Sequence, residues 1–526
     1  MRRRDFVAAG AATGALLINT TSRANTATFA YSEAEIAQLQ ARFASGRLTS
    51  RTLTAAYLAR IDAIDRRGPK LNSIIELNPD ALAIAAELDR ERKAGKTRGL
   101  LHGIPILLKD NVATADKMQT TAGSVALLGA QAPRDAFVAR RLRDAGAVIL
   151  GKTNLSEWAN FRSSRSTSGW SSRGGLTRNP FALDRSASGS SSGSAAAISA
   201  DLAVAAIGTE TDGSIVSPSS ICGVVGFKPT VGRVSRDGIV PISHTQDTAG
   251  PMTRSVADAV AVLAAIAGTD ARDNATTGAP PLDLGGALDA NALRGARIGM
   301  VRNPVGRHPA VKALFDAQVD RLKAAGAELV PDLEIPNVAR MGEYELEVLL
   351  TEFKSGLNAY LAQFGGGAPV ATLTELIAFN ESARAMVMPH FDQEFLVQAQ
   401  AKGGLDSEPY RNALAQCRTL SRVEGLDALF ASHRVDAIIA PSGGPAWLID
   451  LVNGDSVTGG ISRPAAVAGF PHLTVPMGQV GGLPVGLSFI GPAWSDALVL
   501  RLGYAFEQAT HARRAPTFAK SINPKA

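Results

Sequence analysis

The chain has 526 residues, of which 45% are hydrophobic and 19% charged, a balance that excludes an intrinsically disordered protein. Its formal net charge is +6, and the first 24 residues contribute +3 of this through four arginines and one aspartate. Beyond them we find no run rich in lysine or arginine, so we expect no nucleic-acid partner.

The first 24 residues have the layout of an export signal: a basic start, an apolar run from Phe6 to Ile18 and a small-residue end. The apolar run is too short to span a membrane. The order Arg3-Arg4-Asp5-Phe6-Val7 resembles the twin-arginine signal, whose cargo is exported already folded. We therefore expect a periplasmic or secreted protein with a mature domain over 25–526 and no stable membrane association after cleavage. An uncleaved anchor is the alternative.

Helices and strands alternate along most of the mature chain. Ser32 and Glu35 have the spacing of a capping box, ahead of Ile36, Leu39 and Phe43 on one helical face. The other predicted helices cover 53–64, 79–96, 137–146, 255–267, 309–325 and 496–510. The predicted strands are 72–77, 103–111, 147–150, 202–207, 297–302, 435–441, 472–477 and 485–491.

Short apolar strands that alternate with helices predict an α/β fold: a single large domain with a central mixed, mostly parallel twisted sheet, covered by helices on both faces. Residues 335–430 differ, because they are mostly amphipathic helix, and we expect them to wall the substrate cleft. Cys222 and Cys417 are too few for a disulfide framework; an oxidising compartment permits one bridge, but we expect two buried free thiols. No histidine has metal-ligand spacing, so we expect no metal site.

A candidate nucleophile lies in "GTETDGSIVSP", residues 208–218, which follows a predicted strand. A glycine before Ser214 suits a sharp turn, and successive backbone N–H groups there could stabilise an oxyanion. Taken alone, this stretch fits an ordinary turn serine better. "GSSSG" around Ser192 also matches the nucleophile elbow of α/β-hydrolases, but so serine-rich a segment matches that pattern easily by chance.

A serine nucleophile needs a base. His244 and His472 have no carboxylate at suggestive spacing. Lys109 ends an apolar strand, where desolvation would favour the neutral amine that serves as a base in some serine hydrolases. From its position alone, a structural lysine at a strand end is as good an explanation.

The segment "SASGSSSGSAAA", residues 186–197, has the composition of a flexible linker, yet it runs directly into an apolar stretch. Together with "GIPILLKDN", "AGAVILGKTNLSEWAN", "SGWSSRGG" and "GTETDGSIVSPSSICGVVGFKPTVGRVS", in this order along the chain, it resembles the amidase signature family. The resemblance continues through "DTAGPMTRSVADAV", "FPHLTVPM" and "GLPVGLSFIGP". It covers nearly all of the mature chain except about 335–430.

This resemblance implies roles for particular residues. Lys109 matches the family's general base, Ser190 the bridging serine that follows a cis peptide bond, and Ser214 the nucleophile. The oxyanion-hole N–H groups would come from Thr211, Asp212, Gly213 and Ser214, and the supporting residues are Gly189 and Ser191. Ser188 and Ser192 replace glycines that are common in this family. The resemblance implies no cofactor.

The substrate is inferred from the same motif. Asp212 stands where many members of the family have glycine, which is similar to the bacterial peptide amidases. No charge occurs over 215–218, where members that act on carboxylate-bearing substrates carry an arginine. We therefore expect release of ammonia from C-terminally amidated peptides or similar neutral amides. The alternatives are an aryl or aliphatic acylamidase, an esterase, an amidotransferase A-type subunit and a non-catalytic binding protein.

Overall fold

The computed structural model describes residues 29–302 and 308–522. The chain divides into two units, Met1–Ser32 and Glu33–Ala526, and every helix and strand named below belongs to the second unit. The export signal expected over residues 1–24 lies outside the described residues.

One sheet dominates the second unit. In the described part of the chain it has eleven strands in the order β1-β3-β2-β6-β8-β7-β12-β13-β11-β9-β10. Their bounds are β1 Ile74–Leu77, β2 Pro105–Lys109, β3 Val148–Thr153, β6 Ala205–Glu210, β7 Val225–Lys228, β8 Thr248–Thr253, β9 Arg297–Val301, β10 Glu328–Leu333, β11 Ala437–Pro441, β12 His472–Val480 and β13 Leu483–Ile490. A separate hairpin pairs β4 Trp170–Ser171 with β5 Gly175–Leu176. Every strand expected from the sequence is present.

The sheet is mixed, as predicted. Parallel pairs join β3, β2 and β6 in one block and β11, β9 and β10 in another. Between these blocks, β8, β7, β12 and β13 pair antiparallel, and β12 and β13 are consecutive strands of one hairpin. The central strands are buried along their whole length, which explains their continuous apolar sequences.

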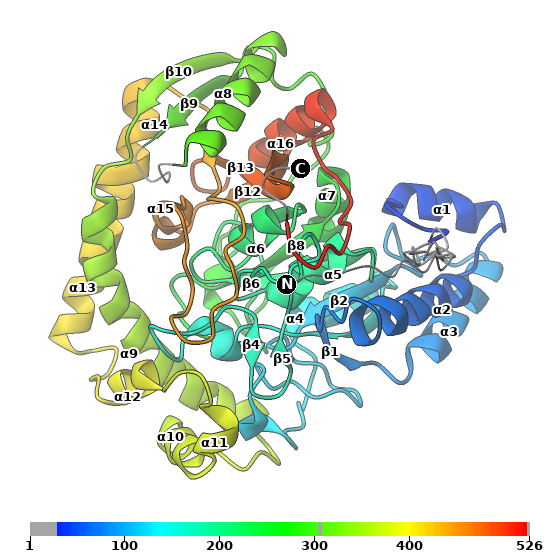
Figure 1. Cartoon of the computed structure of the whole chain (residues 1–526), viewed down its shortest axis with the longest axis vertical. Coiled ribbons are helices and arrows are strands. Elements are labelled where there is room, and N and C mark those ends of the chain that lie inside the picture. Colours follow the sequence, from blue (N-terminus) through cyan, green and yellow to red (C-terminus); the bar gives the residue numbers. More distant parts are fainter. Residues whose placement is uncertain (1–28, 303–307, 523–526) are drawn as a thin grey trace, which may run out of the picture. The chain divides into compact units, whose positions relative to one another are not determined.

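Helices pack around this sheet (Figure 1). Those of the sheet region are α1 Ile36–Ala44, α2 Ser50–Ile61, α3 Ala81–Lys93, α4 Phe137–Asp144, α5 Ser192–Ser199, α6 Val216–Ile221, α7 Val256–Ile266, α8 Pro309–Ala324, α15 Ser462–Ala468 and α16 Asp496–Thr510. Local sequence explains several helix ends: the Thr49 side chain caps α2, and Gly146, at φ +78°, follows α4.

The segment 335–430 is helical, as expected. It contains α9 Val338–Phe364, α10 Leu373–Ser382, α11 Arg384–Val387, α12 Glu394–Gln400, α13 Glu408–Arg418 and the beginning of α14 Asp427–His433. A π-helical stretch, Thr419–Leu426, joins α13 to α14. Helices α9 and α13 run side by side (Figure 1).

The capping box expected at Ser32 and Glu35 is wrong. Helix α1 begins at Ile36 with Glu35 as its N-cap residue, and no side chain of that residue caps it. The Ile36 N–H instead donates to Asp258 Oδ1 of α7 at 3.0 Å. A distant carboxylate thus replaces the local cap, which the spacing of residues along the chain could not reveal.

Candidate active site

The predicted site residues gather at one edge of the sheet. Because β2 and β6 are parallel neighbours, their carboxyl ends meet there. Lys109 is the last residue of β2, and the loop 211–214 directly follows β6. Ser190 lies just before α5, in the serine- and glycine-rich segment. That segment is therefore an ordered loop at the strand ends rather than a linker.

Lys109 contacts the predicted bridging serine. Its Nζ lies 2.8 Å from Ser190 Oγ, and it also donates to Thr209 Oγ1 at 2.9 Å and to the Thr209 carbonyl at 3.2 Å. The side chains of Lys109 and Ser190 are completely buried. This geometry holds one lysine nitrogen within proton-transfer distance of one hydroxyl.

Burial lowers the pKa of Lys109 to about 7, against the opposing effect of the Asp247 and Glu210 carboxylates. Desolvation penalises the ammonium form, so a substantial share of the amine is neutral at pH 7. A neutral amine next to a hydroxyl can accept its proton. The site therefore has a base without a histidine.

The bridging segment is fixed by its backbone. The Gly189–Ser190 peptide bond is cis, and the Ser190 carbonyl accepts from the Ser156 N–H at 3.1 Å. A Cβ on Gly189 would lie 2.2 Å from Ser156 Oγ. Glycine is thus required here because Ser156 leaves no space for a side chain.

We predict that Gly189→Ala destabilises the protein by about 1–3 kcal/mol and removes most activity. The added methyl group would displace Ser156, which holds the Ser190 carbonyl. Thermal unfolding and turnover measured together would check this. The control is Gly286→Ala, because a Cβ there meets nothing within 4 Å. If the two variants behaved alike, the packing explanation would be wrong.

Ser191 connects the base to the nucleophile loop. Its Oγ donates to the Thr209 carbonyl at 3.1 Å and accepts from the Thr209 N–H at 3.2 Å. Its own backbone N–H donates to the Ser214 carbonyl at 3.2 Å. Ser191 thus ties Thr209 of β6, which accepts from Lys109, to the residue predicted as the nucleophile.

The loop 211–214 is held from both sides. At its far end, Glu210 Oε2 accepts from the Ile215 and Val216 N–H groups at 2.7 and 3.0 Å. At its near end, the Thr211 hydroxyl donates to Asp247 Oδ1 at 2.5 Å. Gly213 has φ +80°, a left-handed conformation that favours glycine.

Solvent reaches this cluster at the loop. Ser214 and Thr211 are each 8% exposed, whereas Lys109 and Ser190 are 0% exposed. The loop is therefore the part of the cluster that a substrate carbonyl can reach, whereas Lys109 and Ser190 are closed to solvent. A buried amine beside a hydroxyl is compatible with an internal proton relay.

Sequence reasoning missed several supporting residues. Thr209, which accepts from Lys109, lies inside the quoted motif, but the motif alone predicts no role for it. Asp247 accepts a hydrogen bond from the Thr211 hydroxyl. Glu210 accepts hydrogen bonds from the Ile215 and Val216 N–H groups. The available signal was that all three are hydroxyl or carboxylate side chains inside quoted motifs, since such groups commonly satisfy the N–H groups of a loop.

The rival candidates have other partners. His472 Nε2 lies 2.6 Å from Ser488 Oγ, and burial lowers the pKa of this buried histidine to about 3. His244 is half exposed, with Nδ1 3.4 Å from Glu352 Oε2. The Ser192 hydroxyl donates to the Ser188 carbonyl within its own loop. These contacts are structural.

The two cysteines can be checked directly. Cys222 and Cys417 are buried free thiols, as expected. Over residues 29–302 and 308–522, no cluster of three or more His, Cys, Asp or Glu side chains could hold a metal ion. No helix of that described part has both the length and the apolar character needed to cross a membrane.

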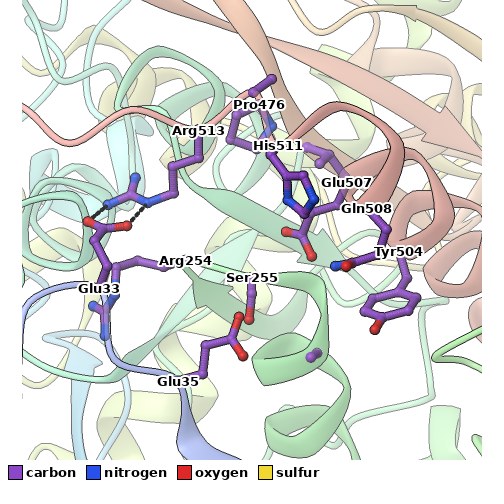
Figure 2. A pocket seen from close by; sticks show the side chains of 13 residues that line it. Glu33, Glu35, Arg254, Ser255, Pro476, Tyr504, Glu507, Gln508, His511 and Arg513 are labelled. Carbon is purple, nitrogen blue, oxygen red and sulfur yellow. Dashed lines mark hydrogen bonds and ion pairs between the residues drawn. The ribbon is translucent and has the colours of Figure 1, made fainter. Parts of the chain in front are cut away.

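A pocket lies at α16 and the start of α7, and none of the predicted site residues lines it. Figure 2 shows the Glu507, Glu35 and Ser255 side chains around it, and the ion pair of Arg513 with Glu33. Glu507 accepts from the Val256 N–H at 3.0 and 3.2 Å. Burial, together with the Glu35 and Asp258 charges, raises the pKa of Glu507 to about 8.

This raised pKa predicts a pH-dependent stability. Glu507 binds its proton more tightly in the folded protein, so its ionisation removes stability as the pH rises from about 4.5 to about 8. We predict that Glu507→Gln raises Tm at pH 9 by roughly 1–3 °C and leaves it unchanged at pH 4. The control is Glu328→Gln, at a side chain 66% exposed. An equal shift at both pH values would contradict the prediction.

Comparison with known proteins identifies the family of the chain. A family model described as Amidase matches residues 52–500. The crystal structure of native peptide amidase from Stenotrophomonas maltophilia is 54% identical, with a TM-score of 0.90, and the match covers 93% of this chain and 99% of that one.

Curated relatives extend the comparison. A protein named probable amidase from Arabidopsis thaliana is 42% identical over 93% of each chain. The A subunit of a glutamyl-tRNA(Gln) amidotransferase from Symbiobacterium thermophilum is 36% identical, over 90% of this chain and 96% of that one. The chain therefore belongs to the amidase family, whose signature motifs it carries, and is an amide-hydrolysing enzyme of that family.

Proposed function

We propose that this enzyme releases ammonia from C-terminally amidated peptides through an acyl-enzyme on Ser214. The observation that carries the proposal is the contact of Lys109 Nζ with Ser190 Oγ, beside the loop that presents Ser214. The likeness to a peptide amidase at 54% identity supports the substrate class.

The first half of the reaction forms the acyl-enzyme. Ser214 Oγ attacks the amide carbon while its proton passes to Ser190, whose own proton passes to neutral Lys109. The negative charge that develops on the carbonyl oxygen is stabilised by backbone N–H groups of the loop 211–214. Ser190 then gives a proton to the amide nitrogen as Lys109 returns one to Ser190, and ammonia leaves.

The second half hydrolyses the ester. Water attacks the acyl carbon as its proton passes through Ser190 to Lys109. Ser190 then gives a proton to Ser214 Oγ as Lys109 returns one to Ser190, and the carboxylic acid leaves. Both halves of the reaction use the same three residues, with the proton transfers of the second half running in the reverse direction. The proposed reaction therefore uses no cofactor. Gly189 and Ser191 hold the relay in place.

A neutral acyl group next to the scissile amide is favoured by the local sequence. The first residues after Ser214 are Ile215, Val216 and Ser217, and no charge occurs there to pair with a substrate carboxylate. The Ile215 and Val216 side chains are buried in the protein. An amidated peptide presents no carboxylate at its reacting end, so it suits this site.

The test is ammonia release by residues 25–526 from an amidated dipeptide, with Ser214→Ala as the blank. The same dipeptide as its anilide, an aliphatic amide and an aryl ester would be compared by kcat/KM. A preference of about 10-fold or more for the dipeptide amide would support the proposal. A preference for the anilide or the ester would make the enzyme an acylamidase or an esterase.

We also propose that the enzyme is exported through its first 24 residues, which carry Arg3 and Arg4. Export would separate it from the aminoacylated transfer RNA that a cytosolic amidotransferase subunit serves. Fractionation of cells expressing the full chain and its Arg3→Lys/Arg4→Lys variant would test this. Equal amounts of both proteins in the periplasm would contradict export by the twin-arginine route.

A further inference from the structure

A chain of polar contacts leads from the nucleophile loop to helix α9. Gln246 Nε2 lies 3.4 Å from the Thr211 carbonyl and donates to Glu345 Oε1 at 3.0 Å. On the other side, Arg463 Nε donates to Glu345 Oε2 at 2.8 Å and lies 3.8 Å from Asp212 Oδ2. Glu345 is therefore linked to both residues that begin the loop.

The contacts are largely shielded from water. The Glu345 side chain is 5% exposed and that of Asp212 22%, whereas Arg463 is 43% exposed. Burial, together with the charge of Asp212, raises the pKa of Glu345 to about 7, and Arg463 opposes this rise. Two carboxylates in such a place repel each other unless a cation lies between them.

Two glycines beside this cluster lie too close to their neighbours to carry a side chain without displacing them. A Cβ on Gly342, one turn before Glu345 in α9, would lie 3.1 Å from Arg463 Nη1. A Cβ on Gly213 would lie 2.9 Å from Ser462 Oγ, at the start of α15. Helix α15 therefore lies close to the loop. Because Gly342 has no side chain, the Arg463 guanidinium can pack against α9.

Loop position matters because the oxyanion hole is made of backbone. An N–H group stabilises the transition state only where it points at the oxygen, and loss of one such donor costs about 10²–10³-fold in kcat. The proposed donors flank the Asp212 side chain. A change in where that carboxylate lies would therefore turn the neighbouring N–H groups.

We propose that Glu345 and Arg463 are positioning residues for the oxyanion loop, acting through Gln246 and Asp212. Helix α9 then contributes to the rate of the reaction, and not only to the wall of the cleft. The inference rests on the proposed function, because it assigns these residues to the same site.

The test compares Arg463→Met and Glu345→Gln with the parent protein. We expect kcat for an amidated dipeptide to fall about 10–100-fold while KM changes less than about threefold. Affinity for a peptide aldehyde, which forms a tetrahedral adduct on the serine, should fall in parallel with kcat. Affinity for the peptide acid product should not change. Arg463→Lys should restore part of kcat, since it retains the charge.

The matched control is Arg384→Met, which removes a different arginine–glutamate pair, Arg384 with Glu381. Both residues lie in the helical segment 335–430, which also contains Glu345. Arg384→Met should leave kcat unchanged. A double-mutant cycle adds Asp212→Gly, after which Arg463→Met should have a much smaller effect. Equal losses in Arg384→Met and Arg463→Met, or a change confined to KM, would overturn the inference.

The two proposals fail differently. If the parent hydrolyses an aryl ester but not the dipeptide amide, the substrate assignment fails, and the loop is still tested by kcat for the ester and by aldehyde affinity. If the parent hydrolyses the amide and Arg463→Met does so equally fast, only the positioning role fails. A parent that neither turns over substrate nor binds aldehyde would overturn both.

Discussion

Ser214→Ala is expected to reduce ammonia release at least about 10⁴-fold. Ser214 is the serine of the loop 211–214 and is 8% exposed, whereas Lys109 and Ser190, which contact each other, are completely buried. Removal of its hydroxyl leaves the oxyanion loop intact but removes the atom that attacks the carbonyl carbon. Turnover of an amidated dipeptide, followed by an enzyme-coupled ammonia assay, measures the loss.

Two further measurements make the result specific. Ser192→Ala, at the serine of the rival "GSSSG" pattern, should keep most activity because that hydroxyl only donates to the Ser188 carbonyl. Mass spectrometry after rapid quenching should find an acyl adduct on the peptide containing Ser214. If Ser192→Ala lost activity and Ser214→Ala kept it, the nucleophile would have to be reassigned.

Lys109→Met is expected to lower kcat/KM for the amide by about 10²–10⁴-fold, the usual contribution of a general base. In the parent, activity should rise as the pH passes through about 7, because Lys109 must lose its proton before it can accept one from Ser190. The variant should lack this acidic limb. The loss should be smaller for an aryl ester, whose leaving group needs no proton.

The control for this prediction is another buried lysine. Lys152 is also completely buried and donates to Thr120 Oγ1 at 2.8 Å and to the Val112 carbonyl at 2.5 Å, but not to Ser190. Lys152→Met should lower Tm and preserve the acidic limb near pH 7. A limb that vanished in Lys152→Met and persisted in Lys109→Met would exchange the roles of the two residues.

Much of the fold follows from local sequence. Strands such as β2 and β6 are short apolar runs bounded by polar residues, and amphipathic spacing predicts helices such as α3 and α7. The order in which strands pair depends on contacts between distant residues. The sequence therefore predicts a mixed sheet, but not the antiparallel strands between its two parallel blocks.

In the candidate site, too, some residues can be predicted from local sequence and others only from the packing of distant segments. Lys109, Ser190 and Ser214 lie in motifs that can be recognised along the chain, and the structure brings them to one edge of the sheet. Glu345 and Arg463 could not be found so, because nothing near them in sequence resembles a site. Their relation to the loop exists only once α9 and α15 pack together.

The double attachment of Ser191 has a consequence for how this enzyme can diverge. Because Ser191 bonds both to Thr209, which accepts from Lys109, and to the carbonyl of Ser214, a shift of one displaces the other. Substitutions that shift the relay by small steps would break the contacts of Ser191 with both Thr209 and the Ser214 carbonyl, so natural selection would remove them. Variation among descendants should accumulate instead in the helices around the cleft, so new substrates would be acquired while the chemistry stays the same.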